Sequence, residues 1–175
     1  MHETLCDYVL ELVNNAIEAG AKKVDLLLEE HPDNTLLRVL DDGKGMCAED
    51  VRNCFDPFRT DSCKHPERRT GLGLALLEAA VFDVEGTVNI KSEPGLRTEI
   101  MVTFDPRRPD ALPVGNLAEL GLLLCSGTET CSFRLTHHRR QIGYQINFQT
   151  GLSSRQNSPL HVKTEIARWE ETLVI

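Results

Sequence analysis

The chain has 175 residues, of which 41% are hydrophobic and 26% charged, a composition typical of one globular domain with room for a small appendage. Its formal net charge of −8 argues against a general nucleic-acid binder, because such proteins carry a basic excess on the face that meets phosphates. No apolar run approaches the roughly 18 residues that a membrane-spanning helix needs, and the N-terminus lacks the basic flank of a signal peptide. We therefore expect a cytoplasmic protein that binds neither nucleic acid nor a membrane.

The first forty residues predict a helix followed by two strands. Apolar residues recur at helical spacing from Leu5 to Ile17, and Gly20 follows as a residue that commonly ends a helix. Residues 23–30 and 35–41 are apolar runs of strand length, joined by the turn-forming sequence at 32–34. The short connection indicates that these two strands pair antiparallel.

A polar segment that contains glycine and arginine comes next, followed by a second helix and a hairpin. Leu74 to Phe82 predicts the helix, and residues 87–93 and 97–104 alternate as strands do, with Pro94 and Gly95 at the turn between them. We expect an α+β fold in two layers, with a mixed, mostly antiparallel sheet and helices on one face.

The chain divides at a proline-rich stretch, residues 105–113, which we interpret as a linker between a domain at 1–104 and a small α/β extension at 114–175. In the extension, residues 117–124 and 162–173 predict helices. Its leucines at 120, 122, 123 and 124 either cover one end of the sheet or form a surface for dimerisation.

A hairpin is expected between these two helices, with strands at 132–136 and 141–148. The cluster from His137 to Arg140 would then form the tip of the hairpin, where charged side chains meet water.

Polar side chains form a stripe on the first helix. Glu11 and Asn15 lie four residues apart, so they project from one face, and Glu18 follows three residues later. An amide oxygen such as that of Asn15 suits Mg²⁺, and a carboxylate one turn away can orient or deprotonate a water molecule. A solvated helix face explains the same residues equally well.

Two glycine-containing motifs flank the polar middle of the domain. The sequence from Asp41 to Met46 (DDGKGM) follows a strand, and its glycines permit close approach by a ligand. The sequence from Arg69 to Leu74 (RTGLGL) opens a helix, whose free N–H groups can bind an anion. Each motif alone is also compatible with an ordinary turn, as is the sequence from Gly95 to Thr98.

Taken together, in this order and at these separations, the four motifs resemble the N, G1, G2 and G3 boxes of the GHKL superfamily of gyrases, heat-shock chaperones, histidine kinases and MutL proteins. ELVNNAIEAGA is similar to the N-box of MutL-type ATPases, and NCFDPFRT resembles the F-box of sensor kinases. TGLGLALLEAAVFDVEGTVNIKSEPGLRTEIMVTF is similar to the G2-to-G3 region of sensor histidine kinases. The resemblance covers residues 5–104 and implies the Bergerat fold of these ATPases.

The resemblance implies that the chain binds ATP with Mg²⁺. In that reading Asn15 is the Mg²⁺ ligand, Glu11 is the general base of the ATPase branch, and Asp41 accepts a hydrogen bond from the adenine amino group. Gly45 shapes the purine pocket, and Thr98 helps to hold the adenine. Further nucleotide contacts fall on the following residues: Gly43, Met46, Phe58, Arg69, Thr70, Gly71, Leu72, Gly73 and Leu74.

The resemblance also makes residues 59–70 the ATP lid, whose excess of basic residues would lie beside the triphosphate. The position that is usually basic in histidine kinases, three after the N-box asparagine, is Glu18, and the lid sequence of MutL is absent. Only ten residues precede Glu11, so we expect no phospho-acceptor histidine on a dimerisation helix. The length and the proline-containing junction resemble those of small stand-alone bacterial ATP-binding proteins.

Two functions therefore remain open. In the first, the protein hydrolyses ATP or passes a phosphoryl group to a separate protein, as a kinase that acts in trans in signalling. In the second, it is a non-catalytic, ATP-gated module that docks a partner through its lid or its extension. Either could operate as a homodimer.

Overall fold

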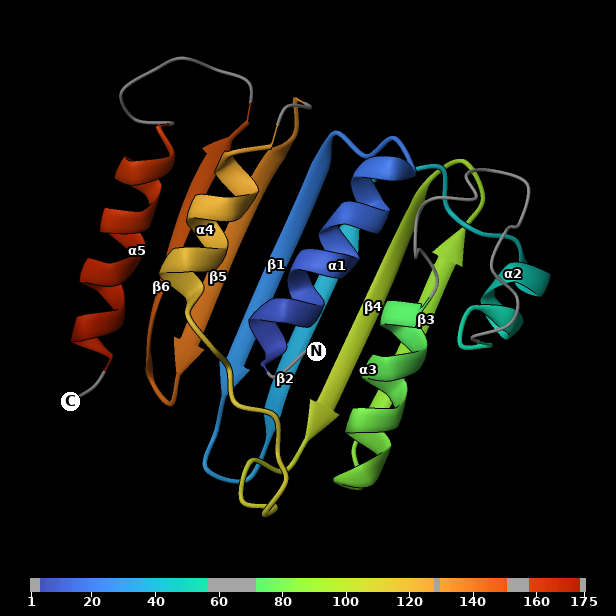
Figure 1. Ribbon diagram of the computed structural model, residues 1–175, viewed down its shortest axis with the longest axis horizontal. Helices are drawn as coiled ribbons and strands as arrows, with labels where there is room; N and C mark the ends of the chain where they lie inside the picture. The colour runs from blue at the N-terminus through green and yellow to red at the C-terminus, as the bar shows by residue number, and fades with distance from the viewer. Residues whose placement is uncertain (1–3, 57–71, 128–129, 151–157, 174–175) are drawn as a thin grey trace.

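The computed structural model describes residues 4–56, 72–127, 130–150 and 158–173 (Figure 1). These ranges hold one six-stranded sheet and a layer of helices. Among the described helices, none combines the length and apolar character that a membrane crossing requires. The elements, in chain order, are α1 (Leu5–Glu18), β1 (Lys23–Glu30), β2 (Thr35–Asp41), α2 (Ala48–Asn53), α3 (Leu72–Asp83), β3 (Thr87–Glu93), β4 (Arg97–Phe104), α4 (Leu117–Cys125), β5 (Ser132–Arg139), β6 (Ile142–Gln149) and α5 (Pro159–Thr172).

The strands follow the order β3-β4-β2-β1-β5-β6. β1 pairs with β5 in parallel, and every other neighbouring pair is antiparallel. Helices α1, α3, α4 and α5 lie on one face of the sheet (Figure 1). The expected α+β fold, with two layers and a mixed, mostly antiparallel sheet, is therefore confirmed.

Alternation along each strand separates the two faces of the sheet. Val24, Leu26 and Leu28 of β1 are buried against the helices, whereas their odd-numbered neighbours lie on the open face. α1 buries an apolar stripe on the same core, and its N-cap residue Thr4 forms a capping box with Asp7. The core thus lies between one sheet face and the helices, which leaves the strand ends available for a site.

The C-terminal segment extends this sheet rather than forming one of its own. β5 pairs with β1 along its whole length, from Lys23 opposite Ser132 to Glu30 opposite Arg139. α4 and α5 pack against each other over the added strands, and Leu120 and Leu124 are buried in the common core. Of the leucines considered for a dimer surface, Leu123 remains exposed.

The predicted hairpin tip was wrong for His137. β5 continues to Arg139, and the chain turns at Arg140, which has a φ of +57°. His137 lies within the strand with its side chain on the helix side, and it is fully buried, at 0% exposure. Charged side chains from other elements stabilise it there, and a hairpin pattern read along the sequence cannot reveal them.

A partly buried network of charged side chains surrounds His137 and connects α5 to the sheet. The imidazole Nδ1 lies 2.8 Å from Glu170 Oε1 of α5, and Nε2 lies 2.7 Å from Glu30 Oε1 of β1. Tyr144 donates its hydroxyl to the same Glu170 oxygen at 2.6 Å, and Arg139 donates to Glu30 at 3.0 Å. This network of hydrogen bonds and ion pairs therefore connects three strands, β1, β5 and β6, with helix α5.

Candidate functional site

Asp41 ends β2 at the edge of the core. Only 8% of it is exposed, and its Oδ1 accepts a hydrogen bond from the Gly43 N–H at 2.8 Å. Burial raises the pKa of this carboxyl above its usual value and outweighs the Gly43 hydrogen bond, which lowers it, while the nearby Asp42 charge raises it further. Thr98 of β4, equally buried, lies directly opposite Asp41 in the strand register. The two residues predicted to hold adenine are thus neighbours on adjacent strands, and both are largely buried from solvent.

Gly45 sits where a side chain cannot fit. Its φ is +63°, and an added Cβ would overlap the carbonyl group of Glu93. The neighbouring Lys44 carbonyl accepts a hydrogen bond from the Gly95 N–H at 2.6 Å. The loop after β2 and the turn between β3 and β4 are therefore held together by backbone contact.

Ser92 joins the same two segments, and the sequence did not indicate it. Its hydroxyl accepts a hydrogen bond from the Met46 N–H at 2.8 Å, donates to the Arg97 carbonyl and lies 2.9 Å from Thr98 Oγ1. The signal that could have found it is the register of the predicted hairpin, since Ser92 pairs with Thr98 across it. Ser92 thus positions both Met46 and Thr98.

The other end of the site combines α1 with the start of α3. Asn15 is exposed on α1, and the half-buried Glu11 lies one turn before it. A Cβ added to Gly73, in the first turn of α3, would lie 2.6 Å from Glu11 Oε2. The predicted acid therefore lies against the glycine motif, and a side chain at position 73 would have to displace the Glu11 carboxylate.

The remaining predicted residues are only partly described. Leu74 is half-buried and packs against the core. Leu72 begins α3, but its side chain lies outside the described residues, as do Phe58, Arg69, Thr70, Gly71 and the rest of the expected lid.

Comparisons with known proteins place these residues in a family. The family model for histidine kinase-, DNA gyrase B- and HSP90-like ATPases matches residues 2–108. The chain is 33% identical over 98 residues to the sensor histidine kinase YxdK of Bacillus subtilis (strain 168), a match that covers 54% of this chain and 30% of that protein. It is 37% identical over 100 residues to the sensor histidine kinase CpxA of Escherichia coli (strain K12), covering 55% and 22%.

A mismatch-repair protein and one solved structure are also similar. DNA mismatch repair protein MutL of Flavobacterium psychrophilum is 41% identical over 59 residues, which are 34% of this chain and 10% of that protein. The catalytic domain of histidine kinase ThkA, in a nucleotide-free form, gives a TM-score of 0.48 at 21% identity and covers 60% of this chain and 68% of that one. The chain spans less than a third of the length of these curated relatives. Because the family model covers more than half of it, the chain belongs to the histidine kinase-, DNA gyrase B- and HSP90-like ATPase family, and this membership supports ATP binding.

Proposed function

We propose that this protein binds ATP together with Mg²⁺ and either hydrolyses it or transfers its γ-phosphoryl group to a separate protein. One observation carries the proposal: Glu11 Oε2 on α1 faces Gly73 at the start of α3, and Asn15 lies one turn after Glu11 on the same helix. An acid, an amide ligand and a helix start are the groups that phosphoryl chemistry requires in one place.

The exposed amide of Asn15 fits a hard cation that takes oxygen ligands. Asn15 would hold Mg²⁺ together with phosphate oxygens, and the cation would neutralise charge on the triphosphate. Glu11 supplies the base: its carboxylate accepts a proton from a water molecule as the water oxygen attacks the γ-phosphorus. The bond from that phosphorus to the bridging oxygen then breaks, and ADP leaves.

At the other end, the Asp41 carboxylate and Thr98 would hold the adenine, with Gly45 leaving room for the ring. This assignment is supported by two hydrogen bonds, one from the Gly43 N–H to Asp41 and one between Ser92 and Thr98. Because these bonds already hold both side chains in place, neither has to be ordered when the adenine ring binds.

In the transfer version, a separate protein receives the phosphoryl group. His137 is not suited to receive it, because its ring is fully buried and both nitrogens contact carboxylate oxygens. In the hydrolysis version, water takes the place of that acceptor.

The proposal is tested by ADP release from MgATP, with ATP binding measured in parallel by calorimetry. We expect Glu11→Ala to bind ATP but release ADP about 10²–10⁴-fold more slowly, as for the loss of a general base. Asp41→Asn should lose binding, because an amide offers the adenine amino group a weaker acceptor. Glu78→Ala, which removes an exposed carboxylate elsewhere on α3, is the matched control and should behave as wild type.

The outcomes separate the two functions. Tight binding by the wild type without ADP release would reject hydrolysis and leave transfer to a protein or an ATP-gated module that docks a partner. Failure of the wild type to bind MgATP would reject the proposal altogether.

A further inference from the structure

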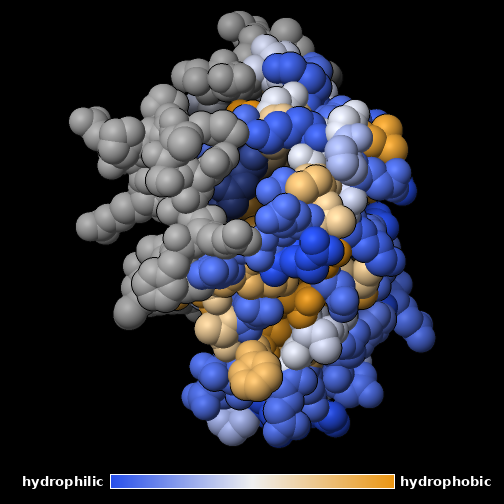
Figure 2. Space-filling view, turned by 90° about the vertical axis from the view of Figure 1, so that its right-hand side faces the viewer, coloured by the Kyte–Doolittle hydropathy of each residue, from blue (hydrophilic) through white to orange (hydrophobic). Residues whose placement is uncertain are grey.

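Among the described strands, β6 lies at one end of the sheet and pairs with β5 alone. Its eight residues, IGYQINFQ, include neither a charge nor a proline. Natural sheets usually protect a long exposed edge with charges, prolines, bulges or a covering segment. The opposite edge strand, β3, carries Lys91 and Glu93, and hydrophilic residues cover much of the side of the molecule that holds it (Figure 2). β6 therefore differs from β3 in having no charged side chain along its edge.

The register of the β5–β6 hairpin shows which backbone groups of β6 point outward. Arg139 pairs with Ile142 across the turn, and the Thr150 N–H donates to the Cys131 carbonyl at 2.9 Å. Because hydrogen-bonded pairs alternate along an antiparallel ladder, the even-numbered residues of β6 bond to β5. The N–H and C=O groups of the odd-numbered residues point away from β5; these are Gly143, Gln145, Asn147 and Gln149.

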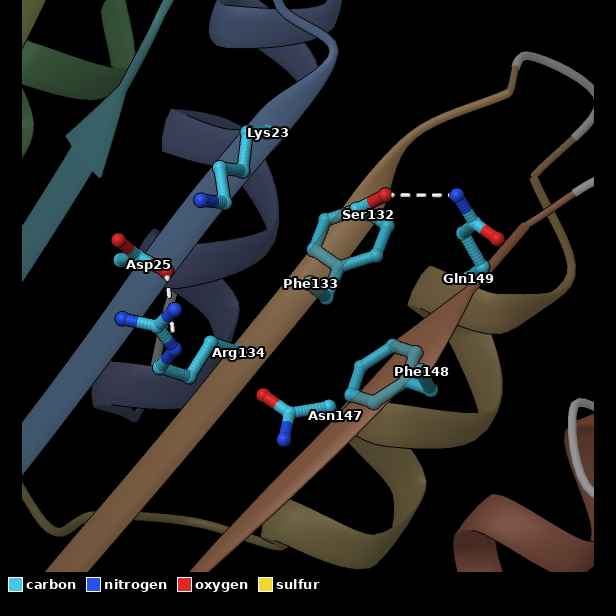
Figure 3. Close-up of a pocket in the computed structure, with 8 residues that line it drawn as sticks. All are labelled: Lys23, Asp25, Ser132, Phe133, Arg134, Asn147, Phe148 and Gln149. Carbon is cyan, nitrogen blue, oxygen red and sulfur yellow. Dashed lines mark hydrogen bonds and ion pairs between the residues drawn. The ribbon is translucent and has the colours of Figure 1, made fainter.

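The two faces beside this edge differ in character. Gly143, Gln145 and Asn147 are exposed, and Figure 3 shows the neutral amides of Asn147 and Gln149 on the open face, beside a hollow of about 320 Å³. On the helix side Ile146 is half-buried. Trp169 of α5 stacks on Tyr144 with ring centroids 6.1 Å apart and remains 43% exposed. One side of the edge is thus neutral and polar, and the other is apolar.

We propose that β6 pairs antiparallel with β6 of a second copy of this chain, about a two-fold axis at Ile146. In this register Gln145 faces the partner's Asn147, and Gly143 faces the partner's Gln149. Each such pair exchanges two backbone hydrogen bonds, so all the outward groups of both strands are used. The axis brings Ile146 against the partner's Ile146 on the apolar side.

A second copy is favoured over a foreign strand because this edge is complementary to itself. An isologous two-fold contact requires each residue to suit its symmetry partner, and here amide meets amide and isoleucine meets isoleucine. The chain also carries a net charge of −8, so two copies repel over most of their surfaces and approach with least repulsion along an uncharged strand.

The first test is the molecular mass in solution, measured by sedimentation equilibrium over a wide concentration range. We expect the wild type to have twice the mass of one chain, and Asn147→Lys and Asn147→Pro to have the mass of one. Proline at 147 removes an N–H that points away from β5, so the hairpin keeps its own ladder. Asn89→Lys makes the same change on the other edge strand and should leave the dimer intact; circular dichroism checks the fold of each variant.

The second test reads the register. Residues that face each other in a non-hydrogen-bonded antiparallel pair have Cα atoms about 4.5 Å apart, within the range of a disulfide. Ile146→Cys should therefore join to its own copy under oxidised glutathione, with the linked peptide identified by mass spectrometry. Gln149→Cys, which faces residue 143 of the partner instead, is the matched control and should not.

A wild type that stays monomeric at every concentration overturns the proposal, and so does a dimer that keeps its mass in both Asn147 variants. A monomer that takes up an added neutral strand peptide at β6 would assign the edge to a foreign partner instead. Neither result bears on ATP binding, because the variants lie outside the nucleotide site.

Discussion

Replacing His137 with leucine is expected to destabilise the protein by about 3 kcal/mol. The substitution keeps an apolar body in the core but removes two short contacts, from Nδ1 to Glu170 and from Nε2 to Glu30. A hydrogen bond to a charged group contributes about 1.5–3 kcal/mol, and breaking a buried ion pair costs about 3–5 kcal/mol. We use the lower end of the range for a buried ion pair, because Glu30 keeps its hydrogen bond from Arg139 and Glu170 keeps its hydrogen bond from the Tyr144 hydroxyl.

The reason is electrostatic, because an ionised carboxylate only accepts hydrogen bonds. With a carboxylate oxygen at each nitrogen, the ring satisfies both contacts only as the imidazolium. Burial lowers the pKa of His137, but the hydrogen bonds to Glu170 and Glu30 and the charges of those carboxylates outweigh it and raise the pKa above 6.5. For Glu30 and Glu170, burial alone would raise the pKa. The hydrogen bonds from His137, together with Arg139 beside Glu30 and the Tyr144 hydroxyl on Glu170, outweigh burial and lower both pKa values.

These shifts set the pH window of the network. A raised histidine pKa gives stability that is fully present below 6.5 and is lost as the pH rises through the folded-state pKa. Lowered glutamate pKa values give stability that is present above 4.5 and is lost as the pH falls through their folded-state values. The network should therefore stabilise α5 most between about pH 4.5 and 6.5 and weaken on the alkaline side.

Urea unfolding at a series of pH values measures both effects. The chain has a single tryptophan, Trp169, which stacks on Tyr144 beside the network, so its fluorescence reports on the docking of α5. His138→Ala is the matched control, since this neighbouring side chain is 47% exposed and its Nδ1 lies 3.7 Å from Glu29. It should cost less than about 1 kcal/mol.

Two results would refute the reasoning. One is a decrease in the free energy of unfolding for His137→Leu that is no larger than the decrease for His138→Ala. The other is an unchanged alkaline slope of stability once His137 has been replaced. A double variant, His137→Leu with Glu170→Gln, separates charge from packing, because it removes the carboxylate charge that has lost its histidine while the amide oxygen still accepts the hydrogen bond from Tyr144. It should recover part of the lost stability.

Three further predictions concern the nucleotide end. Gly45→Ala should abolish ATP binding and lower the free energy of unfolding by more than about 2 kcal/mol, because the added Cβ overlaps the Glu93 carbonyl. The control is Gly95→Ala, where φ is +76° but the surroundings are open; it should lower the free energy of unfolding by about 1–2 kcal/mol and keep ATP binding. Urea unfolding and calorimetry measure the two effects. Ser92→Ala should weaken ATP binding about tenfold by freeing Met46 and Thr98, whereas Thr87→Ala, which removes the hydroxyl pair at the far end of the same strand, should leave the affinity unchanged. Asp42→Ala should cost about 1–2 kcal/mol in urea unfolding, because its Oδ1 accepts from the N–H groups of both Lys22 and Lys23.

Local patterns predicted most of the elements. The alternation of residues 97–104 and the helical spacing from Leu5 to Ile17 reflect burial against one core, so both elements were predicted to within a residue or two of their bounds. α2 was missed because its six residues are too few to show a period, and its capping box uses Cys47, an unusual capping residue. Signals that depend on neighbours in the chain are therefore visible in a sequence, provided that the element is long enough.

Features that depend on distant residues were not visible. Nothing local indicates that β5 lies parallel to β1, or that His137 is buried, since its partners Glu30 and Glu170 lie far away in the chain. The predicted site residues lie in short motifs that can be recognised one at a time, such as Asp41 with Gly43, but the structure is needed to show that Glu11 lies against Gly73 and Asp41 opposite Thr98. Ser92 lies outside any such motif, and it was overlooked although the same hairpin brings it to Thr98.

The segment between β4 and β5 explains how the extension is attached. The chain leaves β4, passes β2 and β1 and enters β5, which is three strand spacings or about 14 Å away. β4 and β5 point in the same direction, so the chain must also return along the sheet, and α4 makes that return in the helix layer. The path is fixed at the N-terminus of α1, where the N–H groups of Leu5 and Cys6 donate to the carbonyls of Pro113 and Val114 at 2.9 and 3.0 Å. Because these bonds occupy N–H groups that the first turn of α1 leaves without a helical partner, the proline-rich segment is part of the packing of α1.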